Sequence, residues 1–402
     1  MGLLPLRARY RSVLLDLDGV LYRGDEAISG AAEAVRALRG EGRAVVFLTN
    51  NSSRTPAAVA EKLTRLGIEA APEEVVTSAM ATAAMLEGAG TAFVIGEEGV
   101  REALAEAGVT VVDGEPERAD AVVVGWDRSA DYDAIRVASL LVHRGARLLA
   151  TNTDVSYPAP GGELWPGAGA LVAAVETATG VRAAVGGKPR RPLFDAALER
   201  AGVAAGEALM VGDRLETDVV GAVRAGIDAA VVFSGAGLPR ELLDHDELPV
   251  AAMPDAGGLA EPRPRVRFRP AGPRDEGTVR GLLSSAGLEG EGPVEEAVVG
   301  EDEGRAVATA SAAVGGETGY LHSVAVVGEV RGRSVGMLAV AAAARRAAGA
   351  GARELLLVTE DAAAFFARMG FDADDRGAFD AWVRDRSRAG SSSATAMRRS
   401  LA

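Results

Sequence analysis

Two aspartates placed two residues apart constrain this 402-residue chain more than any other feature. The stretch Asp16-Leu17-Asp18-Gly19 follows Val13-Leu14-Leu15, an apolar run typical of a buried parallel strand. Side chains two positions apart leave a strand on the same face, so both carboxylates point to one place. Such a pair suits metal-assisted phosphoryl transfer, with one carboxylate as nucleophile and the other as acid and base. For this stretch alone, a capped strand end or a turn is the alternative.

A second apolar run ends in a polar segment that suits phosphate binding. Residues 44–48 read as a buried strand, and Thr49-Asn50-Asn51-Ser52-Ser53 follows directly. Short hydroxyls, amides and backbone N–H groups at a strand end hold phosphate well. A polar loop with a helix cap before Pro56 is the alternative here.

Two further segments complete a set of four. Gly186-Gly187-Lys188-Pro189 is a glycine turn that presents one ammonium group. Residues 208–212 form another apolar run, which ends in Asp213 and is followed by Asp218; carboxylates at this point suit a hard ion such as Mg²⁺. Each segment is weak alone, but four in order along the chain predict one composite site.

The lysine content draws separate attention to Lys188. The chain has 43 basic residues, and all except Lys62 and Lys188 are arginines. One of these two lysines lies in the glycine turn, where a compact charge is needed. A lysine contacts phosphate and carboxylate as a point charge, whereas a guanidinium is a wide planar fork.

The four segments resemble the motifs of the haloacid dehalogenase superfamily, and their details resemble its class IIA phosphatases. The resemblance covers roughly residues 10–250. The matching stretches are Asp-Leu-Asp-Gly-Val-Leu-Tyr-x-Gly (16–24), Thr-Asn-Asn-Ser-Ser-Arg-Thr (49–55), Gly-Lys-Pro (187–189), Val-Gly-Asp-Arg-x-x-Thr-Asp (211–218), Gly125-Trp126-Asp127 with Tyr132, and Thr151-Asn152-Thr153-Asp154.

The resemblance and the residue types together predict hydrolysis of a phosphomonoester through an aspartyl-phosphate. Asp16 is the expected nucleophile, and Asp18 is the acid and base. Lys188 offsets the repulsion between carboxylate and phosphate. The remaining roles are phosphate binding by Thr49, Asn50 and Lys188; Mg²⁺ binding by Asp16, Asp213 and, as the family implies, the backbone carbonyl of Asp18; and orientation of this shell by Asp218.

The spacing between motifs predicts an inserted domain. Residue 49 lies 33 positions after residue 16, but Lys188 lies 139 positions after Thr49. One strand–helix step needs about 30 residues, which leaves roughly 100 residues for an insertion. We therefore expect an α/β fold with a doubly wound, Rossmann-like parallel-sheet core at 1–79 and 184–250. An α/β cap at 80–183 is expected to close over the site and set substrate specificity.

The cap must then determine the substrate. Asp127, Asn152 and Asp154 resemble family positions that face the core. Two carboxylates in a cap suit a polyhydroxy leaving group, which favours a small polyol or sugar phosphate such as glycerol 3-phosphate. For Asn152 and Asp154, a hinge turn between cap and core is the alternative.

A composition break precedes a second, separate domain. Several prolines and glycines between 249 and 264 indicate an exposed linker at 251–264. The part at 265–388 is similar to a GNAT acyltransferase, which implies an α+β fold. The Gly-Ser-Ser-Ser-Ala run at 390–394 indicates a disordered tail at 389–402.

One loop of this domain is the expected acetyl-CoA site. In the family it binds pyrophosphate on backbone amides at a helix N-terminus. Two departures weaken catalysis: Ser334 replaces a usual glycine, and Phe366 stands where a tyrosine often serves as general acid. An acetyl-CoA-dependent N-acyltransferase, a CoA sensor and a docking domain remain alternatives for this part. A non-catalytic protein that keeps the phosphatase pocket as a sensor is a further alternative, against which the complete set of Asp16, Asp18, Lys188 and Asp213 argues. The loop comprises Arg331, Gly332, Arg333, Ser334, Val335 and Gly336.

Composition restricts the partners. A net charge of −14 argues against nucleic acid and acidic membranes. The absence of cysteine excludes disulfides, a thiol nucleophile and thiolate zinc sites. No apolar run reaches the length of a membrane span and no signal peptide is recognised, so we expect a cytoplasmic enzyme. A homodimer stays open.

Overall fold

The computed structural model describes residues 4–86, 88, 90–158, 163–288, 292–374 and 394–401. Its contacts divide the chain into two compact units. One comprises residues 7–228 with 255–257, and the other residues 1–6, 229–254 and 258–402. No helix among the described residues combines the length and apolar character needed to cross a membrane.

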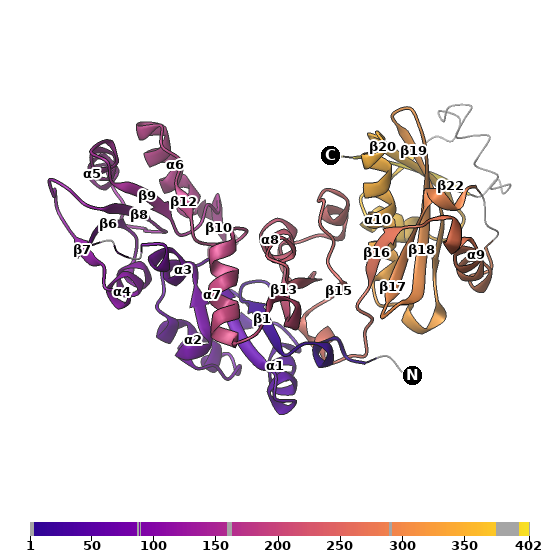
Figure 1. Cartoon of the computed structure of the whole chain (residues 1–402), viewed down its shortest axis with the longest axis horizontal. Coiled ribbons are helices and arrows are strands. Elements are labelled where there is room, and N and C mark those ends of the chain that lie inside the picture. Colours follow the sequence, from indigo (N-terminus) through magenta and orange to yellow (C-terminus); the bar gives the residue numbers. More distant parts are fainter. Residues whose placement is uncertain are drawn as a thin grey trace. The chain divides into compact units, whose positions relative to one another are not determined.

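The core is a six-stranded sheet in the order β15-β14-β13-β1-β4-β5 (Figure 1). Strands β4 and β5 are added on one side of β1, and the later strands β13, β14 and β15 are added on its other side. The predicted doubly wound topology is therefore confirmed. The strands are β1 (Ser12–Asp16), β4 (Ala44–Thr49), β5 (Val75–Thr77), β13 (Ala208–Gly212), β14 (Asp228–Val232) and β15 (Ala251–Met253), and the helices α1 (Ala31–Gly40), α2 (Pro56–Arg65), α7 (Arg191–Ala201) and α8 (Val220–Arg224).

Burial and capping explain these core elements. Every residue of β1 is buried, as expected for a central parallel strand covered on both faces. Helix α2 begins where Thr55 accepts a hydrogen bond from Ala58 N at 3.2 Å and Pro56 occupies the first turn. A short hairpin, β2 (Tyr22–Arg23) and β3 (Glu26–Ala27), follows the first aspartates.

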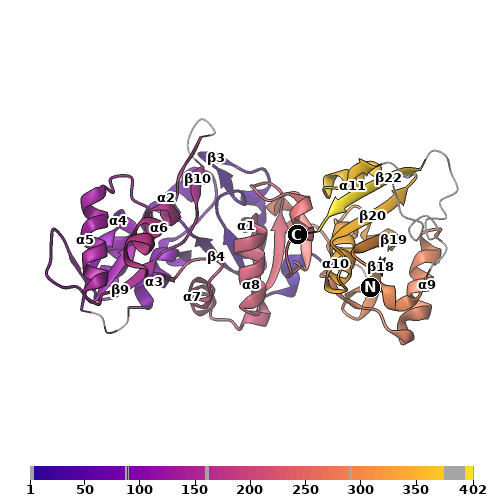
Figure 2. The ribbon, with the colours of Figure 1, turned by 90° about the horizontal axis from the view of Figure 1, so that it is seen from above.

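The cap is a five-stranded parallel sheet in the order β12-β9-β8-β6-β7, covered by helices (Figure 2). It includes β12, so the cap sheet extends slightly beyond the predicted boundary at residue 183. The strands are β6 (Thr91–Ile95), β7 (Thr110–Val112), β8 (Ala121–Val124), β9 (Arg147–Ala150) and β12 (Ala184–Val185), with α3 (Ser78–Ala84), α4 (Glu98–Glu106), α5 (Tyr132–His143), α6 (Ala168–Thr179) and the hairpin β10 (Ser156–Pro158)–β11 (Leu164–Pro166).

Alternation along β8 shows how both faces of the cap sheet are buried. Val122 and Val124 pack in one cluster with residues of α5 and α6. Ala121 and Val123 pack in a second cluster with residues of α3 and α4. The apolar run at 121–124 therefore serves two cores at once.

The C-terminal domain is built on a seven-stranded mixed sheet in the order β16-β17-β18-β19-β20-β22-β21, with α9 and α10 on opposite faces. Strands β19 and β20 pair in parallel over only three residues each. The elements are β16 (Arg267–Pro270), β17 (Ala297–Asp302), β18 (Arg305–Gly315), β19 (Thr318–Val326), β20 (Glu354–Thr359), β21 (Asp372–Asp374), β22 (Thr395–Ser400), α9 (Glu276–Ser285), α10 (Val335–Gly349) and α11 (Ala363–Arg368).

Two predictions about the ends of this domain are wrong in part. The expected linker at 251–264 contains strand β15, whose three residues are buried, and the buried side chain of Arg263. The expected tail at 389–402 contains β22, which pairs with β20 and β21. Ala396 and Met397 bury their side chains there, while Arg398 binds Glu354 and Asp374. The small and polar residues before β22 favoured the prediction of a tail, and the strand itself is too short to give a strong apolar pattern. Residues 389–393 lie outside the described residues.

Candidate active site

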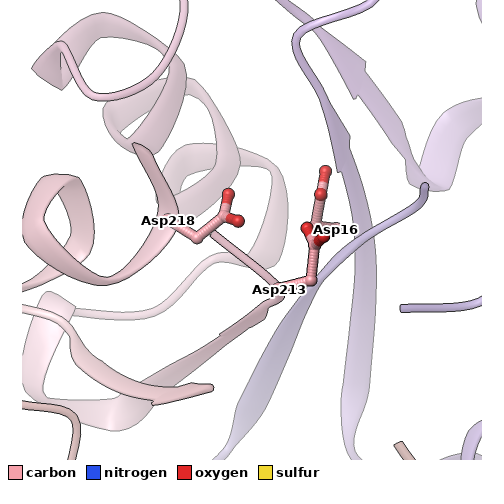
Figure 3. A group of neighbouring side chains, drawn as sticks. All are labelled: Asp16, Asp213 and Asp218. Atoms are coloured by element: carbon pink, nitrogen blue, oxygen red, sulfur yellow. The ribbon is translucent and has the colours of Figure 1, made fainter. Parts of the chain in front are cut away.

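Lys188 lies between two carboxylates at the centre of the predicted site. Its Nζ is 2.7 Å from Asp16 Oδ1 and 2.6 Å from Asp218 Oδ1. The lysine side chain is 3% exposed, and both aspartates are buried. Asp213 completes the group: oxygens of Asp16, Asp213 and Asp218 all lie within 4.8 Å of one another (Figure 3).

The parallel sheet explains how residues so distant in sequence meet. Asp16 ends β1, and Asp213 directly follows the neighbouring strand β13. Carboxyl ends of parallel strands share one edge of the sheet, where α/β proteins place ligands. Asp218 lies in the turn of helix at Leu215–Val219, and its Oδ2 accepts a hydrogen bond from Arg214 N at 3.0 Å. A side chain at Gly212 would collide with the Asp218 carboxyl, so glycine is required there.

Burial and charge act in opposite directions on this group. Burial raises the pKa of the Asp16 carboxyl; the Lys188 ammonium lowers it, and the carboxylates of Asp218 and Asp213 raise it further. For Lys188, burial disfavours the charged form, but the two carboxylates outweigh this effect and raise its pKa. Lys188 therefore stays a cation at neutral pH and partly offsets the concentrated negative charge.

Asn50 fixes the turn that carries this lysine. Its Oδ1 accepts a hydrogen bond from Lys188 N at 2.8 Å, and its Nδ2 donates to Lys188 O at 3.1 Å. A side chain at Gly187 would meet Asn50 Oδ1 and Thr151 O, which explains the glycine before the lysine. The Asn50 side chain thus positions Lys188, a role that its resemblance to a phosphate ligand did not indicate.

The same asparagine joins the core to the cap. Asn152 Nδ2 donates to Asn50 O at 2.7 Å, and Asp154 Oδ2 lies 3.3 Å from Asn50 Nδ2. Burial raises the pKa of Asp154, which Arg214 opposes. Two of the three predicted cap residues are therefore brought to the core. The third, Asp127, uses its Oδ1 to accept hydrogen bonds from Ser129 N and Oγ within its own loop.

Asp18 lies beside the group and remains exposed to solvent. Burial raises the pKa of the Asp18 carboxyl, and the Lys62 ammonium and the Tyr22 side chain oppose this rise. Gly19 N donates to Tyr22 O at 2.8 Å, which closes the loop between the two residues. Thr49, at the end of β4, is buried and accepts a hydrogen bond from Asn51 N at 3.0 Å.

Several residues at the cap–core junction carry no strong sequence signal. Trp126 and Tyr157 stack with ring centroids 4.5 Å apart, and Trp126 Nε1 donates to Pro166 O at 3.0 Å. Thr151 Oγ1 donates to the buried Ser52 Oγ at 2.9 Å. Ser52 and Thr151 lie 99 residues apart, and nothing in the sequence indicates that their hydroxyls meet. Tyr157 lies outside the motifs that resemble the family, so the sequence does not indicate its contact with Trp126.

The predicted CoA loop precedes α10 in the C-terminal domain. Ser334 has φ +61°, and Gly332 has φ +75°, so both adopt the left-handed conformation that favours glycine. The buried Arg263 donates a hydrogen bond from Nη1 to Arg333 O at 3.1 Å and so fixes the main chain of the loop. Ser334 therefore bears a strained conformation where the family usually has glycine.

Phe366 is a packing residue in this structure. It is 7% exposed and makes edge-on contacts with Phe365 and Phe371 at centroid distances of 5.0 and 5.7 Å. Its ring has no hydroxyl to donate a proton. The phenylalanine that replaces the usual tyrosine of the family therefore packs in an aromatic cluster.

Fold and site together define a capped α/β enzyme of phosphoryl transfer, and comparison with known families agrees. The profile for haloacid dehalogenase-like hydrolases matches residues 13–110, and a HAD-hydrolase-like profile matches residues 185–257. The acetyltransferase (GNAT) family profile matches residues 271–371. The chain belongs to the haloacid dehalogenase-like hydrolases, with a GNAT domain at its C-terminal end.

Its relatives are phosphatases. A 5'-nucleotidase, YutF, of Bacillus subtilis is 41% identical over 61% of this chain and 95% of its own length. An acid sugar phosphatase of Staphylococcus haemolyticus is 39% identical over 61% of this chain and 94% of its own. The structure of glycerol phosphate phosphatase Rv1692 from Mycobacterium tuberculosis, in complex with magnesium, is 28% identical with a TM-score of 0.71. The structural match covers 92% of this chain and 99% of the Rv1692 chain. The protein is a phosphoric monoester hydrolase of this family.

Replacing Lys188 by arginine tests the packed point charge between Asp16 and Asp218. We expect Lys188→Arg to lower kcat on p-nitrophenyl phosphate at least tenfold, about 1.4 kcal/mol, because a planar fork does not fit between the two carboxylates. Steady-state kinetics measure the change. Arg191→Lys, at a side chain 70% exposed, is the matched control and should leave kcat unchanged. Rates within about twofold of wild type for Lys188→Arg would contradict this reading.

Proposed function

We propose that the enzyme hydrolyses a small polyol or sugar phosphate, with glycerol 3-phosphate as the leading candidate, and that it depends on Mg²⁺. The observation that carries the proposal is the buried group of Asp16, Lys188, Asp213 and Asp218. The substrate choice is supported by the glycerol phosphate phosphatase that matches 92% of this chain.

In the proposed mechanism Asp16 is the nucleophile. One of its carboxylate oxygens attacks phosphorus, the phosphorus–oxygen bond to the leaving alkoxide breaks, and an aspartyl-phosphate forms. Asp18 gives its proton to the alkoxide. It then removes a proton from water, whose oxygen attacks phosphorus and releases phosphate and Asp16. Lys188 holds Asp16 and offsets the negative charge.

The Thr49 hydroxyl and the backbone N–H of Asn50 are the proposed groups that hold phosphate oxygens. Both lie at the end of β4, next to Asp16 in the sheet. The Asn50 side chain is already engaged with Lys188, so its contribution to phosphate binding is assigned to the backbone.

The donor atoms fit a magnesium ion. Asp16 and Asp213 offer carboxylate oxygens within 4.8 Å of each other, and the Asp18 carbonyl is the third ligand implied by the family. Asp218 binds Lys188 and Arg214 N, so we assign it to orienting the group. When bound, the ion would neutralise charge on the phosphate.

The cap residues Asn152 and Asp154 are the proposed link between substrate recognition and catalysis. They contact Asn50, which holds Lys188, so a leaving group in contact with the cap also meets the catalytic turn. Asp127 remains a proposed substrate residue, although its carboxylate is engaged by Ser129.

A panel of phosphate esters tests the function. The wild-type chain with Mg²⁺ should release phosphate from glycerol 3-phosphate faster, in kcat/KM, than from nucleoside monophosphates. Asp16→Asn should reduce release to background with an unchanged circular dichroism spectrum, because an amide cannot attack phosphorus. Near-normal turnover by Asp16→Asn would refute the nucleophile assignment, and a preference for nucleotides would refute the substrate choice.

Metal removal tests the ion. Activity on p-nitrophenyl phosphate should fall to background in EDTA and return with Mg²⁺ more fully than with Zn²⁺, because the site offers oxygen donors without cysteine or histidine ligands. Initial rates across a metal titration measure this. Full activity after exhaustive chelation would be inconsistent with the proposal.

We further propose that the GNAT domain binds acetyl-CoA without efficient acyl transfer. Strands β19 and β20 pair only over their first residues, and the loop at 331–334 leads into a 15-residue helix, α10, whose N-terminus favours anions. Phe366 cannot donate the proton that a tyrosine would.

Thermal unfolding of the full chain tests this binding. Acetyl-CoA in large excess over its Kd should raise the Tm by about 2 °C or more. Gly336→Asp should abolish the shift, because it adds a negative charge at the helix N-terminus, where an added Cβ meets its neighbours at ordinary van der Waals distances. Gly349→Asp, at the other end of α10, is the matched control. A shift retained by Gly336→Asp would refute this loop as the site.

A further inference from the structure

A surface cavity lies at the end of the cap sheet that is farther from the core. Thr91 begins β6, Asp120 directly precedes β8 and Arg147 begins β9, and all three residues line the cavity. At the other end of these parallel strands, Thr151 and Asn152 follow β9 and bind core residues. Strands of four or five residues span roughly 13 to 17 Å, so the cavity is separate from the candidate active site.

The arginines of the cap divide into two groups by their partners. Seven arginines lie between residues 90 and 185. Four of them each form a salt bridge with a carboxylate of the cap: Arg101, Arg128, Arg136 and Arg182. The other three form no salt bridge within the part of the chain that the structure describes, and all three line this one cavity: Arg118, Arg144 and Arg147.

Main-chain carbonyls hold two of these three guanidinium groups in place. Arg144 Nη1 donates to Glu117 O at 3.2 Å, and Arg147 Nη2 donates to Met85 O at 3.0 Å. A carbonyl orients a guanidinium without neutralising its charge. Because each guanidinium carries five N–H donors, both arginines keep donors for a ligand in the cavity.

The charge of the cavity is opposite to that of the whole chain. Asp120 is the one acidic residue in the described lining, and its Oδ2 already accepts hydrogen bonds from Gly90 N, Thr91 N and Thr91 Oγ1 at 2.8 to 3.0 Å. Three arginines and one aspartate leave an excess of positive charge in a chain whose net charge is −14. The cavity volume of about 520 Å³ lies in the range of small-molecule sites.

We propose that this cavity is a second anion site, which binds a small phosphorylated compound with two or more negative charges. Guanidinium groups recognise phosphate through paired N–H donors, and three of them match a ligand with more than one anionic group. The volume leaves room for a ligand larger than a single phosphate. The inference depends on neither the proposed substrate nor the proposed mechanism, because the site lies at the opposite end of the cap strands.

Calorimetric titration of the full chain with inorganic pyrophosphate, in EDTA to exclude catalysis and metal complexes, tests the site. We expect a Kd of about 1 mM or tighter. The double variant Arg118→Gln with Arg144→Gln should weaken binding at least tenfold. Both side chains belong to exposed residues, so the variant should fold, and its circular dichroism spectrum verifies this.

A second double variant, Arg101→Gln with Arg182→Gln, removes the same charge from the same cap and is the matched control. It should change the Kd by less than about twofold, because exposed ion pairs contribute little. Absence of binding, equal weakening in both double variants, or an unchanged Kd in Arg118→Gln with Arg144→Gln would overturn the inference. The last result would place the pyrophosphate elsewhere, as at the loop before α10. Citrate that binds as tightly as pyrophosphate would overturn the assignment to phosphate.

Discussion

The site depends on one buried ammonium that two carboxylates share. Lys188 is 3% exposed and lies within 2.7 Å of both Asp16 and Asp218. Removing the ammonium would leave both carboxylates uncompensated in a medium that solvates ions poorly. The arrangement therefore holds three sequence-distant segments in one geometry, and it keeps the proposed nucleophile, Asp16, beside a cation. Their mutual contacts offset part of the cost of burying these charges.

Asn50 extends this constraint to the cap. Its side chain holds the main chain of Lys188, while its carbonyl accepts hydrogen bonds from Ser78 Oγ and Asn152 Nδ2. The cap is thus joined to the residue that positions Lys188. A displacement of Asn152 would act on the Lys188 turn through this asparagine.

The sequence was most informative where strong local chemistry coincided with apolar runs. The strand ends at Asp16, Thr49 and Asp213 were predictable because parallel strands bring their carboxyl ends to one edge. The function of the Asn50 side chain was not, because it depends on the path of a turn 138 residues away. The rarity of lysine drew attention to Lys188 and not to Lys62, which only the structure places on Tyr22. Strand β22 was not predicted, because it forms through pairing with β20 and β21 and its composition gives no strand signal.

The position of β22 bears on how the C-terminal sheet is completed. This strand follows β20 and β21 in the chain, yet it lies between them in the sheet. Strands β20 and β21 therefore have no direct pairing with each other, and the sheet keeps an open position until β22 is inserted. Until then β20 exposes an edge able to pair with other strands, which makes the insertion of β22 the step of folding most vulnerable to aggregation.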